Sequence, residues 1–266
     1  MLDRFNRKIN YLRISVTDRC NLRCKYCMPE QGVQSLQHED ILSFEEIESI
    51  AKEAVDLGVD KIRLTGGEPL VRKGILNLVQ KIAAINGVKD FGLTTNGVLL
   101  NQFAKPLFDA GLMRINISLD TLDEIRYREL TRGGNVKNVL DGIFAAKEAG
   151  FFPIKINCVI KNNSEEEDAQ LVSEFCAKNG LQVRFIHMMN LENGEFSVVE
   201  GGDGGNCLNC SRLRLTADGK IKPCLFSDLE YDVKKLGIRN ALLMAVNEKP
   251  ECGTSSNNSK FYNIGG

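Results

Sequence analysis

Strand-like and helix-like segments alternate through the first 190 residues of the chain, and this repeat limits the possible folds more than any other feature. Parallel neighbouring strands need crossover connections, which helices supply. The pattern predicts an α/β fold, preferably a partial TIM-like (β/α)6 barrel, with an open doubly wound sheet as the alternative. The six predicted strands are Tyr11 to Thr17, Lys61 to Thr65, Phe91 to Thr95, Arg114 to Leu119, Ile154 to Ile160 and Val183 to Met189.

The segments between these strands have the apolar spacing of amphipathic helices. The first begins at a capping box formed by Ser43 and Glu46 and ends before Gly58. Because polar residues follow several strands, we expect the functional site at the carboxyl ends of the sheet. The other predicted helices are Ile75 to Ile85, Gln102 to Ala110, Val136 to Ala149, Glu166 to Lys178 and Ile238 to Asn247.

The repeat stops near residue 190. Residues 191–206 are rich in Gly, Glu and Asn, which is typical of a linker. A hairpin is predicted beyond them, because Leu213 to Cys224 alternates around the turn signal Asp218-Gly219. The sequence therefore predicts a core barrel in residues 1–190, a Gly-rich linker in 191–206 and a small C-terminal module in 207–266.

The charge balance limits the classes of partner. The formal net charge is -1, with 43% apolar and 26% charged residues, which is typical of a soluble globular protein. Such a chain has no overall attraction for nucleic acid or an acidic membrane, and its apolar runs are too short to span a bilayer. Met1 to Arg13 lacks the apolar stretch of a signal peptide. We expect a cytoplasmic protein that binds neither nucleic acid nor membranes.

Nine cysteines are present, and six of them form two sets of three. Clustered thiols in a reducing compartment are more often metal ligands than disulfides. The other three cysteines stand alone and are expected to have no chemical role. The first set is Cys20, Cys24 and Cys27, the second is Cys207, Cys210 and Cys224, and the isolated residues are Cys158, Cys176 and Cys252.

The spacing of the first set places three thiolates on one short loop. Three thiolates bind three irons of a [4Fe-4S] cluster and leave the fourth iron without a protein ligand. Zinc is the alternative metal. A structural zinc normally takes four protein ligands, however, and only His38 lies nearby in the sequence.

With Tyr26 before its last cysteine, this loop resembles the signature of the radical S-adenosylmethionine (SAM) superfamily. In that superfamily SAM chelates the open iron, and an electron from the reduced cluster cleaves SAM to a 5'-deoxyadenosyl radical. The resemblance implies that Gly67, in the turn Gly66-Gly67-Glu68-Pro69, meets the SAM amino group through backbone oxygen. It also implies that Tyr26, Ser118 and Met189 bind the cofactor.

Nearly the whole chain resembles the GTP 3',8-cyclase (MoaA) family of molybdenum cofactor biosynthesis. The resemblance is carried by the segments LRISVTDRCN at 12–21, RLTGGEPL at 63–70, TTNG at 94–97, CSRLRLTADG at 210–219 and IGG at 264–266. It implies a lyase that converts GTP to 3',8-cyclo-7,8-dihydro-GTP in the first step of molybdopterin biosynthesis. The implied cofactors are SAM and two [4Fe-4S] clusters.

The same resemblance implies the residues of the substrate site. Cys207, Cys210 and Cys224 are expected to bind the second cluster, whose open iron anchors the purine. The catalytic residues are expected to be Arg212 and Arg214 together with the first three cysteines, and the Gly265-Gly266 tail is expected to reach into the site. The residues expected to bind GTP are Arg13, Arg63, Thr94, Lys155, Arg212, Leu213 and Arg214.

The chain departs from the family pattern on the substrate side. The family carries a considerably longer segment between Met189 and Cys207, where this chain has only its Gly-rich connection. His187 stands at a position that is usually Glu, Ser211 replaces an Asn, and Asn206 replaces an apolar residue. The SAM side of the pattern is intact.

Two other functions remain open at this level. One is a radical SAM enzyme with an auxiliary [4Fe-4S] cluster that acts on another nucleotide, a peptide or a small metabolite. The other is a non-enzymatic electron carrier or iron-sulfur sensor, which needs neither a SAM turn nor converging arginines. For the cyclase, the expected partners are GTP and a reductant such as a flavodoxin or ferredoxin, and a homodimer is the candidate assembly.

Overall fold

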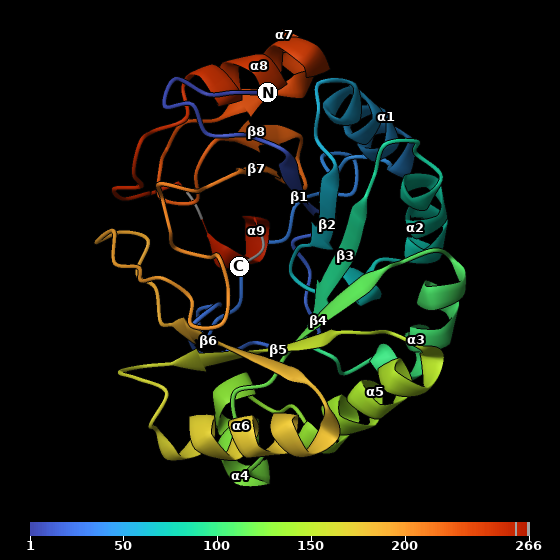
Figure 1. Cartoon of the computed structure of the whole chain (residues 1–266), viewed down its shortest axis with the longest axis vertical. Coiled ribbons are helices and arrows are strands. Elements are labelled where there is room, and N and C mark those ends of the chain that lie inside the picture. Colours follow the sequence, from blue (N-terminus) through green and yellow to red (C-terminus); the bar gives the residue numbers. More distant parts are fainter. Residues whose placement is uncertain (259, 265–266) are drawn as a thin grey trace.

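The computed structural model describes residues 1–258 and 260–264, and its strands form one twisted sheet of nine strands within those ranges (Figure 1). The order β6-β5-β4-β3-β2-β1-β7-β8-β9 places the first six strands side by side in chain order, all parallel. The predicted partial barrel is confirmed. These strands are β1 (Tyr11–Ser15), β2 (Lys61–Thr65), β3 (Asp90–Thr95), β4 (Arg114–Ser118), β5 (Ile154–Ile160) and β6 (Gln182–His187).

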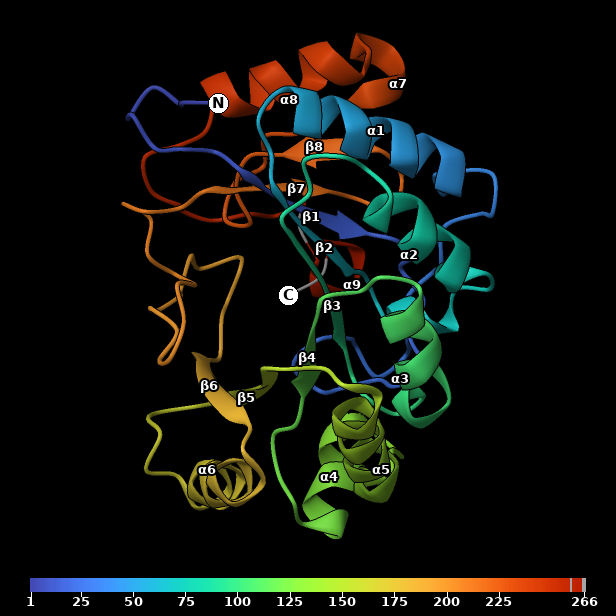
Figure 2. The same ribbon diagram turned by 45° about the vertical axis from the view of Figure 1, so that its right-hand side comes forward.

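Helices cover the outer face of this curved sheet (Figure 2). The predicted capping box at Ser43 and Glu46 is present at the start of α1. The sequence prediction missed α4, because this helix buries only Tyr127 and Thr131 and so has little apolar periodicity. The helices of the barrel are α1 (Phe44–Asp56), α2 (Ile75–Ala83), α3 (Leu100–Asp109), α4 (Glu124–Thr131), α5 (Val136–Ala149) and α6 (Glu167–Asn179), with a 3-10 turn, η1, at Pro69–Val71.

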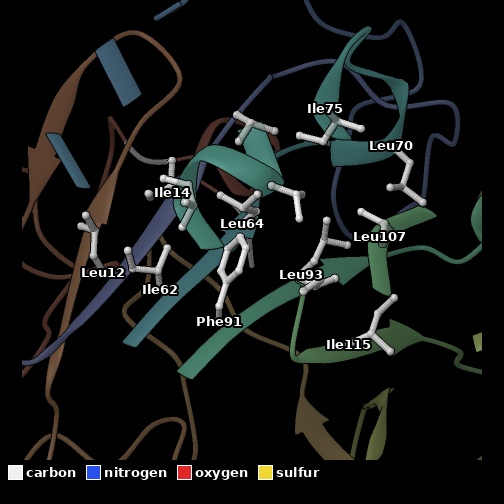
Figure 3. Close-up of a cluster of buried hydrophobic side chains, with 14 of the residues drawn as sticks. Leu12, Ile14, Ile62, Leu64, Leu70, Ile75, Phe91, Leu93, Leu107 and Ile115 are labelled. Atoms are coloured by element: carbon white, nitrogen blue, oxygen red, sulfur yellow. The ribbon is translucent and has the colours of Figure 1, made fainter. Parts of the chain in front are cut away.

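The main hydrophobic core lies between the sheet and these helices (Figure 3). Leu12 and Ile14 of β1 point into it, as do Leu64 of β2 and Phe91 of β3, all with no exposed surface. Successive side chains of a strand point to opposite faces, so the residues between them, including Arg13, face the interior of the barrel. The strand pattern thus separates an apolar outer layer from a polar interior.

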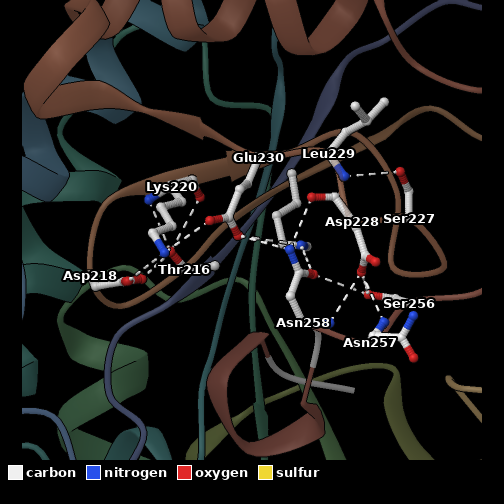
Figure 4. A network of polar contacts seen from close by, with 11 residues as sticks. Thr216, Asp218, Lys220, Ser227, Asp228, Leu229, Glu230, Ser256, Asn257 and Asn258 are labelled. Atoms are coloured by element: carbon white, nitrogen blue, oxygen red, sulfur yellow. Dashed lines mark hydrogen bonds and ion pairs between the residues drawn. The ribbon is translucent and has the colours of Figure 1, made fainter.

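The C-terminal residues extend the same sheet beyond β1. β7 pairs with β1 in parallel, and β8 and β9 continue it in antiparallel pairing. The predicted hairpin around Asp218-Gly219 is the β7–β8 pair. Behind it, Asp228 accepts hydrogen bonds from the Ser256 hydroxyl and from the backbone of Asn257 (Figure 4). The elements are β7 (Arg212–Leu215), β8 (Lys220–Lys222), β9 (Tyr231–Asp232), α7 (Val233–Leu236), α8 (Ile238–Asn247) and α9 (Phe261–Ile264).

The connection between β6 and β7 folds back against the barrel. Isolated bridges join Asn190 to Glu195 and Phe185 to Glu200. Leu191 and Phe196 pack with Phe226 and Ile264 in a second, smaller apolar cluster. Among the described helices, none has the length and apolarity needed to cross a membrane.

Candidate active site

The first cysteine set lies on the loop that follows β1, at the carboxyl ends of the parallel strands. One cavity, of about 1140 Å³ including the part open to solvent, brings the three thiols together with residues from several other strand ends. All four residues expected to bind SAM line it. The predicted residues in this cavity are Cys20, Cys24, Cys27, Tyr26, Gly67, Ser118, Met189 and also Thr94.

The Gly-Gly-Glu-Pro turn is fixed to the loop that leads to Cys20. The backbone N–H of Gly67 donates to the Thr17 carbonyl at 2.7 Å, and that of Glu68 donates to the Arg19 carbonyl at 2.8 Å. A Cβ atom on Gly67 would stand 2.3 Å from the Arg19 carbonyl oxygen. Only glycine allows this approach, so the turn and the cysteine loop form one unit.

Glu68 of this turn is buried and holds the end of β3. Its carboxylate accepts hydrogen bonds from the Thr95 hydroxyl at 2.7 Å and from the backbone N–H groups of Asn96 and Leu70 at 2.7 and 3.1 Å. Burial nevertheless raises the pKa of Glu68 to about 7. Asn96 in turn directs its side-chain amide at the Cys20 sulfur, 3.7 Å away.

Burial also raises the pKa of the Cys24 and Cys27 thiols to about 12. Nearby negative groups add to this shift, above all Asp120 at Cys24 and Cys20 at Cys27. Without a metal these thiols therefore keep their protons, and binding of iron must release them. Three half-buried thiols line this one cavity, and three thiolates are the number that leaves one iron of a [4Fe-4S] cluster open.

A row of arginines crosses three neighbouring strands inside the barrel. Arg13 of β1 is in register with Arg63 of β2 on one side and with Arg214 of β7 on the other. All three side chains face inward, because Leu12 and Leu213 beside them lie in the outer core. The pairing of β7 with β1 therefore creates a line of guanidinium groups between the two cysteine sets.

A basic cavity surrounds part of this row. It is lined by the predicted residues Arg13, Arg63, Lys155 and Arg212, and by three cations that the sequence prediction missed, Lys61, Arg114 and Arg184. All three lie at inward positions of predicted strands, so the two-residue alternation was the signal that could have found them. Among the described residues, the acidic members of this lining are Asp90, which pairs with Arg114, and Asp203.

Several buried polar atoms near these cavities have no hydrogen-bond partner within the described ranges. They include Nη1 of Arg63, the hydroxyl of Thr94 and the side-chain oxygen of Asn116. Buried polar atoms are normally hydrogen-bonded to protein or water, so these atoms are available to a ligand that enters the cavities. Two of the three residues had been predicted to bind substrate.

The electrostatics of the interior favour an anion. Burial lowers the pKa of Arg13 to about 9 and that of Arg214 to about 10, and neighbouring guanidinium groups add to both shifts. Burial and nearby cations also lower the pKa of Lys155 and of Arg184. Desolvated cations that repel one another are stabilised by a polyanionic ligand such as a triphosphate.

The second cysteine set lines a third cavity, which continues from the basic one. Cys207, Cys210 and Cys224 all face it, together with Arg214 and the buried Lys249. Burial acts to raise the pKa of the Cys210 thiol, but Lys249, with help from Arg212, lowers it below its ordinary value. This environment favours the thiolate form that a metal needs. Ile186 lines all three cavities, so they meet around one side chain.

Comparison with known proteins identifies the family. The sequence matches the profile of the Radical SAM superfamily over residues 14–176. It is 42% identical to the GTP 3',8-cyclase of Thermodesulfovibrio yellowstonii, with 94% of this chain and 95% of that protein aligned. With the GTP 3',8-cyclase of Moorella thermoacetica the identity is 43%, over 88% and 86% of the two chains. The chain belongs to the GTP 3',8-cyclase family.

Solved structures agree on the fold. The structure of anSMEcpe with bound AdoMet superposes with a TM-score of 0.66 over 91% of this chain and 81% of that one, at 18% identity. That of Streptococcus suis SuiB has a TM-score of 0.63, covers 92% of this chain and 67% of that one, and is also 18% identical. As a radical SAM protein, this member of the GTP 3',8-cyclase family uses SAM and a [4Fe-4S] cluster.

This GTP 3',8-cyclase family member is shorter than its relatives. The alignment with the Thermodesulfovibrio protein has 305 positions, whereas 94% of 266 residues is about 250, so about 55 positions have no residue here. The connection after β6 nevertheless contributes to the site. Val199, Asp203 and Gly204 line the basic cavity, and the Asp203 carbonyl accepts a 2.8 Å hydrogen bond from Arg212.

Several predicted residues need a more specific description. Leu213 packs its side chain in the hydrophobic core, so only its backbone is available to a ligand. His187, at a departure from the family pattern, lies 3.2 Å from the Glu200 carboxylate and lines the SAM-side cavity. Of the other two departures, Ser211 lines the basic cavity and Asn206 lines the cavity of the second cysteine set. The Gly265-Gly266 tail lies outside the described residues.

Proposed function

We propose that the chain is a GTP 3',8-cyclase that converts GTP to 3',8-cyclo-7,8-dihydro-GTP in the first step of molybdopterin biosynthesis. The observation that carries the proposal is the in-register row of Arg63, Arg13 and Arg214 between the two cysteine sets. A reaction at the ribose of a nucleoside triphosphate needs a radical source on one side and a cationic cradle beside it. The arrangement of the cavities supports both.

In this proposal Cys20, Cys24 and Cys27 hold the first [4Fe-4S] cluster and leave one iron open to SAM. When bound, cluster and SAM supply the radical that takes a hydrogen atom from the 3' carbon of the ribose. Gly67 presents backbone oxygen to the SAM amino group, and Tyr26, Ser118 and Met189 line the same cavity. Enclosure by these residues keeps water away from the reacting atoms.

The interior cations hold the triphosphate. Arg13, Arg63 and Arg214 offer paired N–H donors that match phosphate oxygens. Lys155 and Arg212 extend the same basic lining. Burial and mutual repulsion lower the pKa values of Arg13 and Arg214. A bound anion therefore stabilises the charged form of both side chains in addition to contacting them.

Cys207, Cys210 and Cys224 are proposed to hold a second [4Fe-4S] cluster whose open iron anchors the guanine base. Anchoring the base there, with the phosphates on the arginine row, brings guanine C8 toward the ribose. The protein's main contribution to ring closure is then positioning.

The chain divides into three parts with different roles in this proposal. They are a radical SAM barrel at 1–190, a connection at 191–206 that borders the basic cavity, and a cluster-binding module at 207–266. A small electron carrier such as a flavodoxin or ferredoxin is the proposed reductant.

Anaerobic reconstitution tests this function. The reduced protein is given SAM with GTP, with ATP as the matched nucleotide control, and both 5'-deoxyadenosine and cyclised nucleotide are followed. We expect GTP to stimulate SAM cleavage and to be converted, whereas ATP is not. SAM cleavage without a cyclised nucleotide would point to another substrate, and no SAM cleavage at all would favour an electron carrier.

A further inference from the structure

A fourth cysteine lies against the second cysteine set. The Cys252 thiol donates to the Cys207 sulfur, with 3.2 Å between the two Sγ atoms, although 45 residues separate them in the chain. Its neighbour Gly253 lies beside Cys224, because a Cβ atom on Gly253 would stand 3.2 Å from the Cys224 sulfur. The segment Cys252-Gly253 therefore contacts the Cys207 thiol and passes close to the Cys224 thiol.

Buried Arg7 holds this segment against the cysteine loop. Its Nη1 atom donates to the carbonyl of Cys207 at 2.8 Å and to that of Glu251 at 2.7 Å, and Nη2 donates to the Pro250 carbonyl at 2.7 Å. Asp3 fixes the guanidinium through a 2.6 Å ion pair. The Arg7 side chain thus links Cys207 to Glu251, the residue that precedes Cys252.

The segment is anchored on both sides of Cys252. Before it, Lys249 is buried and donates to the Arg212 carbonyl at 2.8 Å. After it, the Thr254 N–H donates to the Phe226 carbonyl at 3.0 Å. Ser256 then bonds to Asp228 at 2.8 Å in the polar network of Figure 4. The meeting of the two thiols is therefore built into the packing of the module.

We propose that Cys252 is a fourth thiol of the second cluster site and can replace Cys207 as the ligand of the same iron. Because the two sulfurs lie only 3.2 Å apart, they serve one iron in turn rather than two irons together. This inference rests on the proposed second cluster. It leaves the fourth iron open to substrate, because the number of thiolates on iron stays at three.

The exchange needs no oxidant or reductant. The bond between iron and the Cys207 sulfur breaks as a bond to the Cys252 sulfur forms, and the proton of the Cys252 thiol passes to the released Cys207 thiolate. Cys207 is half-buried and Cys252 is exposed, so the pair lies at the solvent side of the site. Loss of one thiol to oxidation then leaves a full set of ligands.

Iron content tests the exchange in a variant whose first set is removed, Cys20→Ala/Cys24→Ala/Cys27→Ala, so that iron reports the second site alone. We expect about four irons per reconstituted chain. Adding Cys207→Ala or Cys252→Ala should lower this by less than about twofold, whereas adding both, or Cys210→Ala alone, should lower it at least about fivefold. Cys176→Ala, which removes a buried thiol of the barrel, is the matched control, and melting temperature confirms folding.

A second measurement leaves the second set unmutated. In the reconstituted first-set variant, brief iodoacetamide treatment and peptide mapping should find label shared between Cys207 and Cys252, with Cys210 and Cys224 protected. Label on Cys252 alone, together with equal iron loss from Cys207→Ala and Cys210→Ala, would overturn the exchange but leave the second cluster standing. A first-set variant that binds no iron would overturn both.

Discussion

The Tyr26 hydroxyl donates a 2.9 Å hydrogen bond to the Asp120 carboxylate, which ties the first cysteine loop to the segment that follows β4. The other carboxylate oxygen of Asp120 accepts the N–H of Val159 in β5 at 2.8 Å. Burial raises the pKa of Asp120 to about 6 and that of Tyr26 well above its ordinary value, so Tyr26 remains a donor at neutral pH. One carboxylate therefore connects the cysteine loop with two strands of the barrel.

Removal of this hydroxyl should loosen the cysteine loop. We expect Tyr26→Phe to lower the free energy of unfolding by about 1 kcal/mol, since one hydrogen bond to a buried carboxylate is lost. Tyr231→Phe is the control, because it loses a 2.8 Å bond to Glu248 far from the loop. Both variants should melt lower in calorimetry, but only Tyr26→Phe should slow SAM cleavage. Equal cleavage rates would contradict a role for Tyr26 in holding the loop.

Glu68 predicts a pH dependence of stability. Its pKa is raised from 4.5 to about 7 by burial. Between these values the folded protein keeps a proton that the unfolded chain has released, so the free energy of unfolding falls as pH rises through this window, by about 3 kcal/mol at most. Glu68→Gln cannot titrate and should flatten the profile. Anaerobic urea denaturation at several pH values from 5 to 8 measures the free energy of unfolding of the unmutated protein and of Glu68→Gln. Parallel profiles of stability against pH would show that Glu68 does not cause the pH dependence.

The sequence predicts the barrel well, because strand alternation is a local pattern. Local spacing also singles out the two cysteine sets, each of which lines one cavity, and their role as cluster ligands stays a prediction. Strand alternation and the spacing of Cys20, Cys24 and Cys27 are read within about ten residues, and the structure confirms the parallel order of the six strands. Element boundaries were predicted less accurately, since the helix predicted from Ile75 to Ile85 ends at Ala83. Helix α4 was missed because its contacts, rather than its periodicity, stabilise it.

Features that depend on register across distant strands were not predictable. Alternation placed Arg212 and Arg214 on one face of their strand, but the row that joins Arg214 to Arg13 arises only when β7 pairs with β1, about 200 residues away. The contact of Cys252 with Cys207 has the same origin, since Arg7 of the N-terminal segment brings their loops together.

Arg13, at the centre of the arginine row, should contribute more to ligand binding than to folding. We expect Arg13→Gln to weaken GTP binding about 10- to 100-fold, because a pair of charge-assisted donors to phosphate is lost. Stability should change little, since burial already disfavours this cation and lowers its pKa to about 9. Arg239→Gln is the matched control, because Arg239 is exposed and pairs with Glu53 on the outer surface. Equilibrium GTP binding and the melting temperature are measured for both variants. If Arg13→Gln bound GTP as tightly as Arg239→Gln, Arg13 would not be part of the GTP site.

The two cysteine sets should fail in different ways when each loses one thiol. Cys24→Ala leaves two thiols on the first loop, so we expect it to abolish production of 5'-deoxyadenosine while the second site still binds iron and GTP. Cys224→Ala should keep SAM binding within about twofold, because Cys224 lies in a different cavity from the SAM residues, but should lose GTP-dependent product. Anaerobic binding assays with each ligand, together with iron content, separate these outcomes. If Cys24→Ala and Cys224→Ala lost SAM binding and GTP binding alike, the two sites would be one cooperative unit and the proposed division between radical formation and substrate anchoring would be wrong.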